Sequence, residues 1–179
     1  MPKNIELKVR CTAENLAEIE RCLRRLTSGA LSLLHQVDHY YAVPGGRLKM
    51  RWIDGNDAEL IRYHRPDVTG ARLSAYERIA LPVETGVELD RVLTDSLGRI
   101  ARVDKIRTVG MLGRTRVHLG TVVGLGCFVE LETMLDDGAD DELAGRAEYE
   151  NVVKLLGLHA FEPIAGSYSD LILEGAFDA

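Results

Sequence analysis

The chain has 179 residues, of which 46% are hydrophobic and 28% are charged, and its formal net charge is −6 at pH 7. This size and composition predict a single globular domain over residues 1–179, and the acidic balance argues against general binding to nucleic acids or anionic membranes. Its 3 cysteines include no CxxC pair, so neither a disulfide framework nor a structural zinc site is predicted. We also expect a cytoplasmic protein, because the first residues are not an apolar leader and no apolar run approaches the ~18 residues of a membrane span.

The chain begins with a pattern typical of a strand followed by a helix. In residues 4–10 (NIELKVR), apolar and polar side chains alternate, so Glu6, Lys8 and Arg10 share one face of a strand. Thr12 can cap a helix over residues 13–26, whose apolar residues recur at helical spacing. One polar strand face is most simply a solvated face, so its meaning depends on the strands that follow.

Most of the remaining chain predicts antiparallel strands joined by short turns such as PGG, DGND and GLG. These strands are expected at residues 33–43, 47–53, 58–65, 71–81, 100–112, 115–123 and 127–135. Thr85 and Glu88 have capping-box spacing and predict the start of a helix, and a last helix is expected over residues 140–158. About eight antiparallel strands without a parallel crossover favour an α+β fold, in which a closed or nearly closed β-barrel carries flanking helices.

Lysines and arginines repeat at alternate positions of several predicted strands, whereas many acidic residues lie in the helices and their approaches. The repeats are Lys8 and Arg10, then Arg47, Lys49 and Arg51, then Lys105 and Arg107, then Arg114 and Arg116, with Arg65 and Arg72 beside a turn. If the strands close, these faces line an interior, where like charges repel strongly unless an anion fills it. Several linked phosphates would suit such an interior, because guanidinium groups match phosphate oxygens. The alternative, in which all of these cations face water, stays open.

Glutamates interrupt the cationic pattern in the segment FVELE. Glu130 and Glu132 alternate on one strand face, so their carboxylates start ~7 Å apart, and Glu6 could join them across the barrel. Three carboxylates could hold a hard divalent cation such as Mg²⁺ together with substrate phosphates. Salt bridges between these glutamates and neighbouring arginines are an equally good interpretation of the pattern.

An ordered set of motifs extends this interpretation. IELK, GRLKMR, AELIRYHR, KIR, RVHL, GLGCFVELE and GSYSDLI occur in the order seen in the CYTH family, which includes class IV adenylate cyclases and thiamine triphosphatases. The sequence therefore resembles a CYTH domain from Asn4 to Leu171. The resemblance implies a triphosphate tunnel of antiparallel strands, a divalent metal (Mg²⁺ or Mn²⁺) on its glutamates, and a basic lining that holds the phosphate tail.

The resemblance also implies roles for particular residues. Glu6, Glu130 and Glu132 correspond to the metal ligands, and Lys8 and Lys105 are the lysines proposed to take part in catalysis. The residues that correspond to the phosphate-binding lining are Lys8, Arg10, Arg47, Lys49, Arg51, Arg65, Arg72, Lys105, Arg107 and Arg116.

Two positions depart from the family pattern. Asn4 and Gly120 stand where the family has acidic residues, so metal should bind more weakly or only together with substrate. Compensation by Asp38, Glu59 or Asp104 is conceivable from the sequence.

Other polar side chains are more simply structural. His39 and His118 are expected to be hydrogen-bonded structural histidines, and Tyr40, Tyr41 and Tyr76 to be packing groups. Ser74 and Cys127 have no base at a readable spacing, so the sequence does not predict a nucleophilic mechanism.

The function that follows is a metal-dependent enzyme acting on a small phosphorylated substrate, either a triphosphate or a nucleotide. Hydrolysis of a phosphoanhydride and cyclisation of the adenylate cyclase type use the same groups, so both stay open. The alternative is a non-catalytic module that binds a phosphorylated ligand, because fold resemblance does not fix function. Neither nucleic acids nor membranes are expected as partners, and a homodimer is left open.

Overall fold

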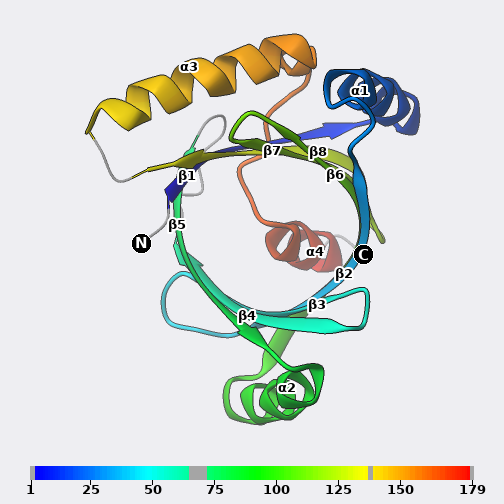
Figure 1. Cartoon of the computed structure of the whole chain (residues 1–179). Coiled ribbons are helices and arrows are strands. Elements are labelled where there is room, and N and C mark those ends of the chain that lie inside the picture. The colour runs from blue at the N-terminus through cyan, green and yellow to red at the C-terminus, as the bar shows by residue number, and fades with distance from the viewer. Residues whose placement is uncertain (1–2, 65–71, 137–138, 178–179) are drawn as a thin grey trace.

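The computed structural model describes residues 3–64, 72–136 and 139–177. In this part of the chain, eight strands close into an antiparallel barrel in the order β1-β5-β4-β3-β2-β6-β7-β8, as Figure 1 shows in a view along the barrel. The strands are β1 (Lys3–Cys11), β2 (Ser32–Tyr41), β3 (Arg47–Ile53), β4 (Asp57–His64), β5 (Arg72–Leu81), β6 (Arg99–Leu112), β7 (Thr115–Val122) and β8 (Gly126–Leu135). The helices are α1 (Ala13–Leu26), α2 (Val83–Leu97), α3 (Ala139–Leu155) and α4 (Tyr168–Phe177), with a 3₁₀ turn, η1 (Leu158–Ala160). The predicted α+β barrel is confirmed.

The helices differ from the prediction in three places. Helix α2 begins directly after Pro82, whose fixed φ suits a helix start, so Thr85 lies inside the helix and the expected capping box is wrong. Helix α3 ends at Leu155 rather than at residue 158, because Gly157 takes a φ of +66° and turns the chain into η1. Helix α4 was not expected at all.

Two of the three apolar clusters in the described residues lie outside the barrel, between the strands and the helices that cover them. Ile5, Leu7 and Val9 of β1 are buried beneath α1 and α3, together with apolar residues of β7 and β8. On the opposite wall, α2 covers Met50 and Ala58. Gly86 of α2 allows this close packing, because a Cβ there would stand 2.6 Å from the Cβ of Ala58. The strand residues of the other parity must therefore face the barrel interior.

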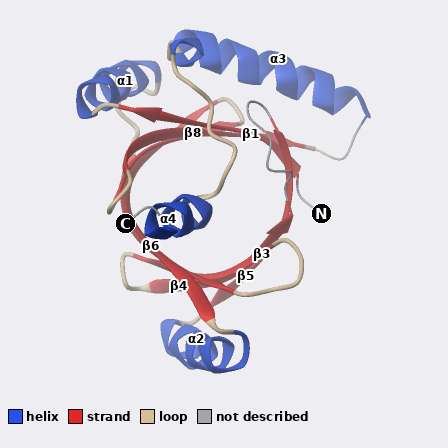
Figure 2. Cartoon of the chain, turned by 180° about the vertical axis from the view of Figure 1, so that it is seen from behind, coloured by secondary structure: helices blue, strands red, loops and turns tan. Residues whose placement is uncertain are grey.

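Helix α4 lies within the outline of the barrel when the molecule is viewed along its axis, from either side (Figures 1 and 2). Tyr168 at its start packs against Phe128 of β8, with ring centroids 5.0 Å apart. Leu171 and Ile172 pack into the same apolar cluster, which includes Val103. These contacts give the interior one apolar end, next to α4. Of the helices in the described residues, none is long and apolar enough to cross a membrane.

Candidate functional site

A cavity of about 190 Å³ lies inside the barrel, and all eight strands contribute to its lining. We call it the lumen. Its charged lining residues are Glu6, Lys8, Lys49, Arg51, Glu59, Arg78, Lys105, Arg107, Arg116, Glu130 and Glu132. The alternative in which all predicted cations face water is wrong, since Lys8, Lys105 and Arg107 are no more than 5% exposed. Burial of so many cations in one cavity is costly unless anions accompany them.

Three of the cations gather on one carboxylate, Asp38 of β2, which is fully buried. Arg51 donates to both of its oxygens, from Nε at 2.8 Å and from Nη2 at 2.9 Å. Lys49 and Lys105 donate to Oδ2 through their Nζ atoms, at 2.9 and 2.6 Å. We call these four residues the Asp38 cluster. Asp38 itself does not line the lumen, whereas its three partners do, so the cations lie between Asp38 and the cavity.

Burial and charge act against each other in the Asp38 cluster. Burial alone would raise the pKa of Asp38, but Arg51, Lys105 and Lys49 outweigh it and hold that pKa well below its usual value. Burial and the charge of Arg51 lower the pKa of Lys49 to about 8, although Asp38 acts in the opposite direction. Burial likewise holds the pKa of Lys105 well below its usual value.

The glutamates of β8 form a second ionic group, which we call the glutamate cluster: Glu130, Glu132, Arg107, Arg116 and His118. Arg107 Nη2 donates to Glu130 Oε1 at 2.7 Å, and the hydroxyl of Tyr168 donates to the same oxygen at 2.7 Å. Glu132 Oε2 lies 3.2 Å from His118 Nε2 and 3.5 Å from Arg116 Nη1. The glutamates are thus salt-bridge partners in this structure.

The glutamate cluster keeps both carboxylates ionised. Burial would raise the pKa of Glu130, but Arg107 and then Lys8 hold it well below its usual value. Burial would also raise the pKa of Glu132, but His118 and Arg116 lower it to about 2. Because burial lowers the pKa of His118 from 6.5, Arg116 carries the permanent positive charge beside Glu132 at neutral pH.

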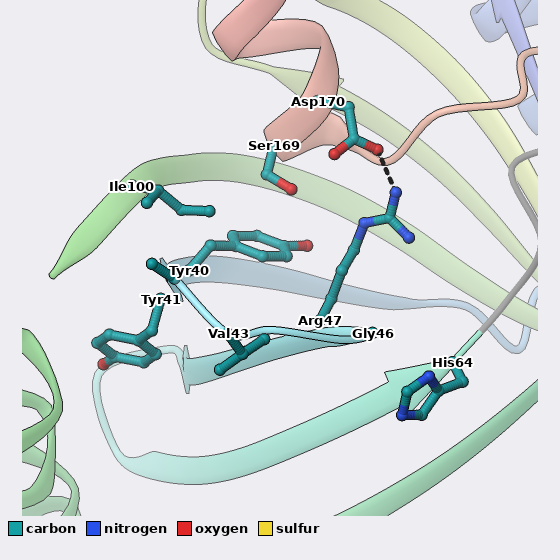
Figure 3. A pocket seen from close by; sticks show the side chains of 10 residues that line it. Tyr40, Tyr41, Val43, Gly46, Arg47, His64, Ile100, Ser169 and Asp170 are labelled. Carbon is teal, nitrogen blue, oxygen red and sulfur yellow. Dashed lines mark hydrogen bonds and ion pairs between the residues drawn. The ribbon is translucent and has the colours of Figure 1, made fainter. Parts of the chain in front are cut away.

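Not every predicted cation lines the lumen. Arg47 pairs with Asp170 of α4, from Nη2 to Oδ2 at 2.6 Å, and faces a second cavity of about 710 Å³. Figure 3 shows this cavity between α4 and the turn that follows Tyr41, with Arg47 reaching up to Asp170. Arg10 is exposed and lies over the ring of Phe128, 5.3 Å from its centroid.

The remaining predicted phosphate-binding residues are Arg65 and Arg72. Arg65 lies outside the described residues. Arg72 pairs through its backbone with Glu6 in the register of β1 and β5.

Two residues that matter to the lumen were missed. Arg78 of β5 lines it and pairs with Glu59 at 3.1 Å, and its two-residue spacing from Tyr76 could have revealed it. Tyr168 also lines the lumen, and Lys8 Nζ lies 3.9 Å from its ring centroid. Among the acids considered as compensation, Glu59 lines the lumen, while Asp104 instead pairs with His35 at 2.7 Å and with Arg102 at 2.8 Å.

His39 behaves as the sequence predicted. Its Nδ1 lies 2.9 Å from Asp90 of α2, and its ring meets Trp52 edge-on. Tyr41 donates to the same carboxylate and is buried beside α2. Both residues therefore support the packing of α2.

The donors for a metal are present but not assembled. Glu6 stands opposite Glu132 in the register of β1 and β8. Oδ1 of Asn4 is buried without a hydrogen-bond partner among the described residues, so a hard cation would satisfy it. However, the described part of the chain has no group of three or more His, Cys, Asp or Glu side chains placed to hold a metal. The donor chemistry fits Mg²⁺ or Mn²⁺, whereas the present arrangement favours salt bridges.

The CYTH domain family model matches residues 2–168, so the chain belongs to the CYTH family. The PH1012 protein of Pyrococcus horikoshii superposes with a TM-score of 0.72 at 20% identity, over 94% of this chain and 98% of that one. A Vibrio parahaemolyticus protein proposed to be an adenylate cyclase gives 0.67 at 14% identity, over 94% and 97%. The Mimivirus capping enzyme triphosphatase gives 0.58 at 12% identity, over 87% and 89%. At these identities the likeness shows the fold alone, and no curated protein matches the sequence.

Proposed function

We propose that this protein is a metal-dependent enzyme that acts on a small triphosphate, free or attached to a nucleoside, held in the lumen. The observation that carries the proposal is the convergence of seven cations on one cavity: Lys8, Lys49, Arg51, Arg78, Lys105, Arg107 and Arg116. Membership of the CYTH family supports it. The names of two structural neighbours, an adenylate cyclase and a triphosphatase, agree with chemistry on triphosphates.

The cations would do most of the catalytic work by position and charge. Phosphoryl transfer needs the reacting groups in line and the charge on the phosphate oxygens stabilised. Arg107 and Arg116 stand beside the glutamates, where a phosphate could exchange places with a carboxylate as their partner. Lys8 and Lys105 would add two further positive charges to the phosphate-binding lining. Lys105, whose pKa burial lowers strongly, is the lysine best suited to change its protonation state.

The proposed metal is Mg²⁺ or Mn²⁺, bound by Glu6, Glu130 and Glu132 with help from the amide oxygen of Asn4. Such a metal would neutralise charge on the phosphate oxygens. Because Glu130 already accepts from Arg107 and Tyr168, a carboxylate becomes available when phosphate attracts the arginine away. Metal and phosphate are therefore expected to promote each other's binding by the same factor.

A product assay tests the proposal. Inorganic triphosphate, ATP and thiamine triphosphate are each incubated with the protein and Mg²⁺ or Mn²⁺, and products are separated by mass spectrometry. Release of orthophosphate would establish a hydrolase, and release of pyrophosphate with a cyclic nucleotide would establish a cyclase. If none of them is turned over with either metal, the proposal of an enzyme fails.

A second candidate is a module that binds a phosphorylated ligand without turning it over. The pairing of Glu130 and Glu132 with cations favours it, as does Gly120, which supplies no ligand. This candidate predicts that triphosphate raises the melting temperature, because a ligand that binds only the folded state stabilises it, while no product forms.

A further inference from the structure

Asp38 has no contact with the lumen, yet it contacts three of the cations that line it. It is 0% exposed, and the three cations stand between it and the cavity. Three positive groups against one carboxylate leave the cluster with a formal excess of positive charge on the side that faces the lumen. An ammonium has three donors and a guanidinium five, so each partner keeps donors that Asp38 does not use.

We propose that Asp38 is a positioning residue, which holds Lys49, Arg51 and Lys105 together as one preformed subsite for a phosphate group. This inference rests on the proposed function, because it assumes that a phosphate chain enters the lumen. Asp38 would act only through its three partners. Its role differs from that of Glu130, which lines the cavity itself.

The physical reason is mutual repulsion. Three cations inside one barrel repel each other strongly, and without a shared anion their side chains would spread apart or lose protons. The guanidinium of Arg51 donates to both oxygens of Asp38. This bidentate contact fixes the orientation of the carboxylate to which the two lysines also donate. A subsite assembled before the ligand arrives avoids the cost of ordering these long side chains on binding.

The first test is Asp38→Asn, measured by titration calorimetry with inorganic triphosphate in EDTA at pH 7. We expect triphosphate to bind about tenfold more weakly or worse, because the loss of order outweighs the extra positive charge. Asp104→Asn is the matched control, since Asp104 also pairs with Arg102 and His35 but lies outside the lumen lining. It should bind triphosphate as the wild type does.

The pH dependence gives a second readout, which a general loss of packing would not produce. Lys49 has a pKa of about 8, and Asp38 is the anion that supports its charge. Removal of Asp38 should therefore shift the fall in triphosphate affinity to lower pH. The groups that face Lys49 are Asp38 and Tyr40 on β2, Arg51 on β3, Tyr63 on β4, and Lys105 and Arg107 on β6.

A variant with matched charge separates positioning from net charge and guards against a misfolded single variant. Asp38→Asn combined with Lys49→Met removes Asp38 together with one of its three partners, so fewer buried cations lose their anion than in Asp38→Asn alone. Compared with Lys49→Met alone, the double variant has one more net positive charge. We expect it to bind triphosphate severalfold more weakly than Lys49→Met. Tighter binding would overturn the proposal, because Asp38 would then only have opposed the ligand.

The outcomes also separate this inference from the proposed function. If the wild type binds no triphosphate with or without metal, the proposed function fails and the inference fails with it. If the wild type binds triphosphate and Asp38→Asn binds it equally well over the same pH range, only the inference is overturned.

Discussion

The two ionic groups of the lumen differ in their balance of charge. In the Asp38 cluster, three cations share one carboxylate that is sealed from the cavity. In the glutamate cluster, Glu130 and Glu132 line the cavity themselves and face two arginines. One wall therefore attracts anions, while the other holds carboxylates that can exchange partners. Under the proposed function, this difference would give the lumen an anion-binding side and a side where a metal could bind once the carboxylates exchange partners.

The largest expected effect comes from Arg107→Ala, which breaks the glutamate cluster. Arg107 is 5% exposed and donates to Glu130 at 2.7 Å. Loss of a charge-stabilising donor typically lowers kcat by about 10²–10³-fold, and one partner of a buried pair left alone costs roughly 3–5 kcal/mol. We expect the fall in kcat in steady-state kinetics with the substrate that the product assay identifies. We expect the loss of stability in urea unfolding.

Arg114→Ala is the control for Arg107→Ala. Arg114 lies in the turn before β7, two residues from Arg116, and pairs with Asp141 and Glu148 of α3. Its loss should leave kcat within about twofold, as is usual for surface changes far from the site. Equal loss of activity in both variants would mean that the lumen is not the site.

Gly120→Asp would strengthen the metal side of the lumen. Gly120 lies opposite Arg107 in the register of β6 and β7, and a Cβ there would meet Ile106 O at 3.4 Å and Arg107 Cβ at 3.5 Å, which is ordinary contact. An added carboxylate supplies an oxygen ligand, so Mn²⁺ should bind about tenfold more tightly in the presence of triphosphate.

Gly120→Asn is the matched variant for this gain, because it has the same size without the charge. Its Mn²⁺ affinity should stay near that of the wild type in titration calorimetry. If the aspartate variant binds Mn²⁺ no better than the asparagine variant, the glutamate cluster is not a metal site.

Strand parity let the sequence predict much of the lumen, but parity gives the face of a residue and not its depth in the barrel. Lys8, Lys49, Arg51 and Lys105 were predicted to face inward, and they do. Arg10 has the same parity as Lys8 but lies near the α4 end, over Phe128. A period of two residues carries no information about where along the axis a helix closes the cavity.

Side-chain pairings between segments that are distant in the sequence could not be predicted either. Asp38 was one acid among several candidates, and its three partners come from β3 and β6. Helix α4 lies at the far end of the chain, and its Tyr168 and Asp170 reach Glu130 and Arg47. Such contacts depend on how the barrel closes, which no local pattern encodes.

Glu132→Gln tests the charge balance through pH. The folded pKa of Glu132 is lowered from 4.5 to about 2, so its stabilising contribution is present above pH 4.5 and is lost as the pH falls towards 2. The melting temperature of the wild type should therefore fall between pH 4.5 and pH 2. The melting temperature of the variant should fall by a few degrees less over the same range. Identical curves in differential scanning calorimetry would contradict the pairing of Glu132 with His118 and Arg116.

The smallest effect is expected at the α4 end of the lumen, from Arg47→Ala. Arg47 pairs with Asp170, which also accepts from the backbone N–H of Ser167 and so fixes the start of α4. Because Asp170 keeps that hydrogen bond, the variant should lose only about 1 kcal/mol, which is roughly 2–4 °C in melting temperature for a chain of this size.

The affinity for triphosphate shows whether Arg47 takes part in phosphate binding. Arg47 faces the second cavity in Figure 3 and does not line the lumen, so Arg47→Ala should bind inorganic triphosphate within about twofold of the wild type. Lys49→Met, two residues along β3 and inside the lumen, should bind it at least tenfold more weakly in the same titration. If Arg47→Ala weakens binding as much as Lys49→Met, the phosphate chain extends past Tyr40 towards α4, and the sequence-based role of Arg47 in phosphate binding is restored.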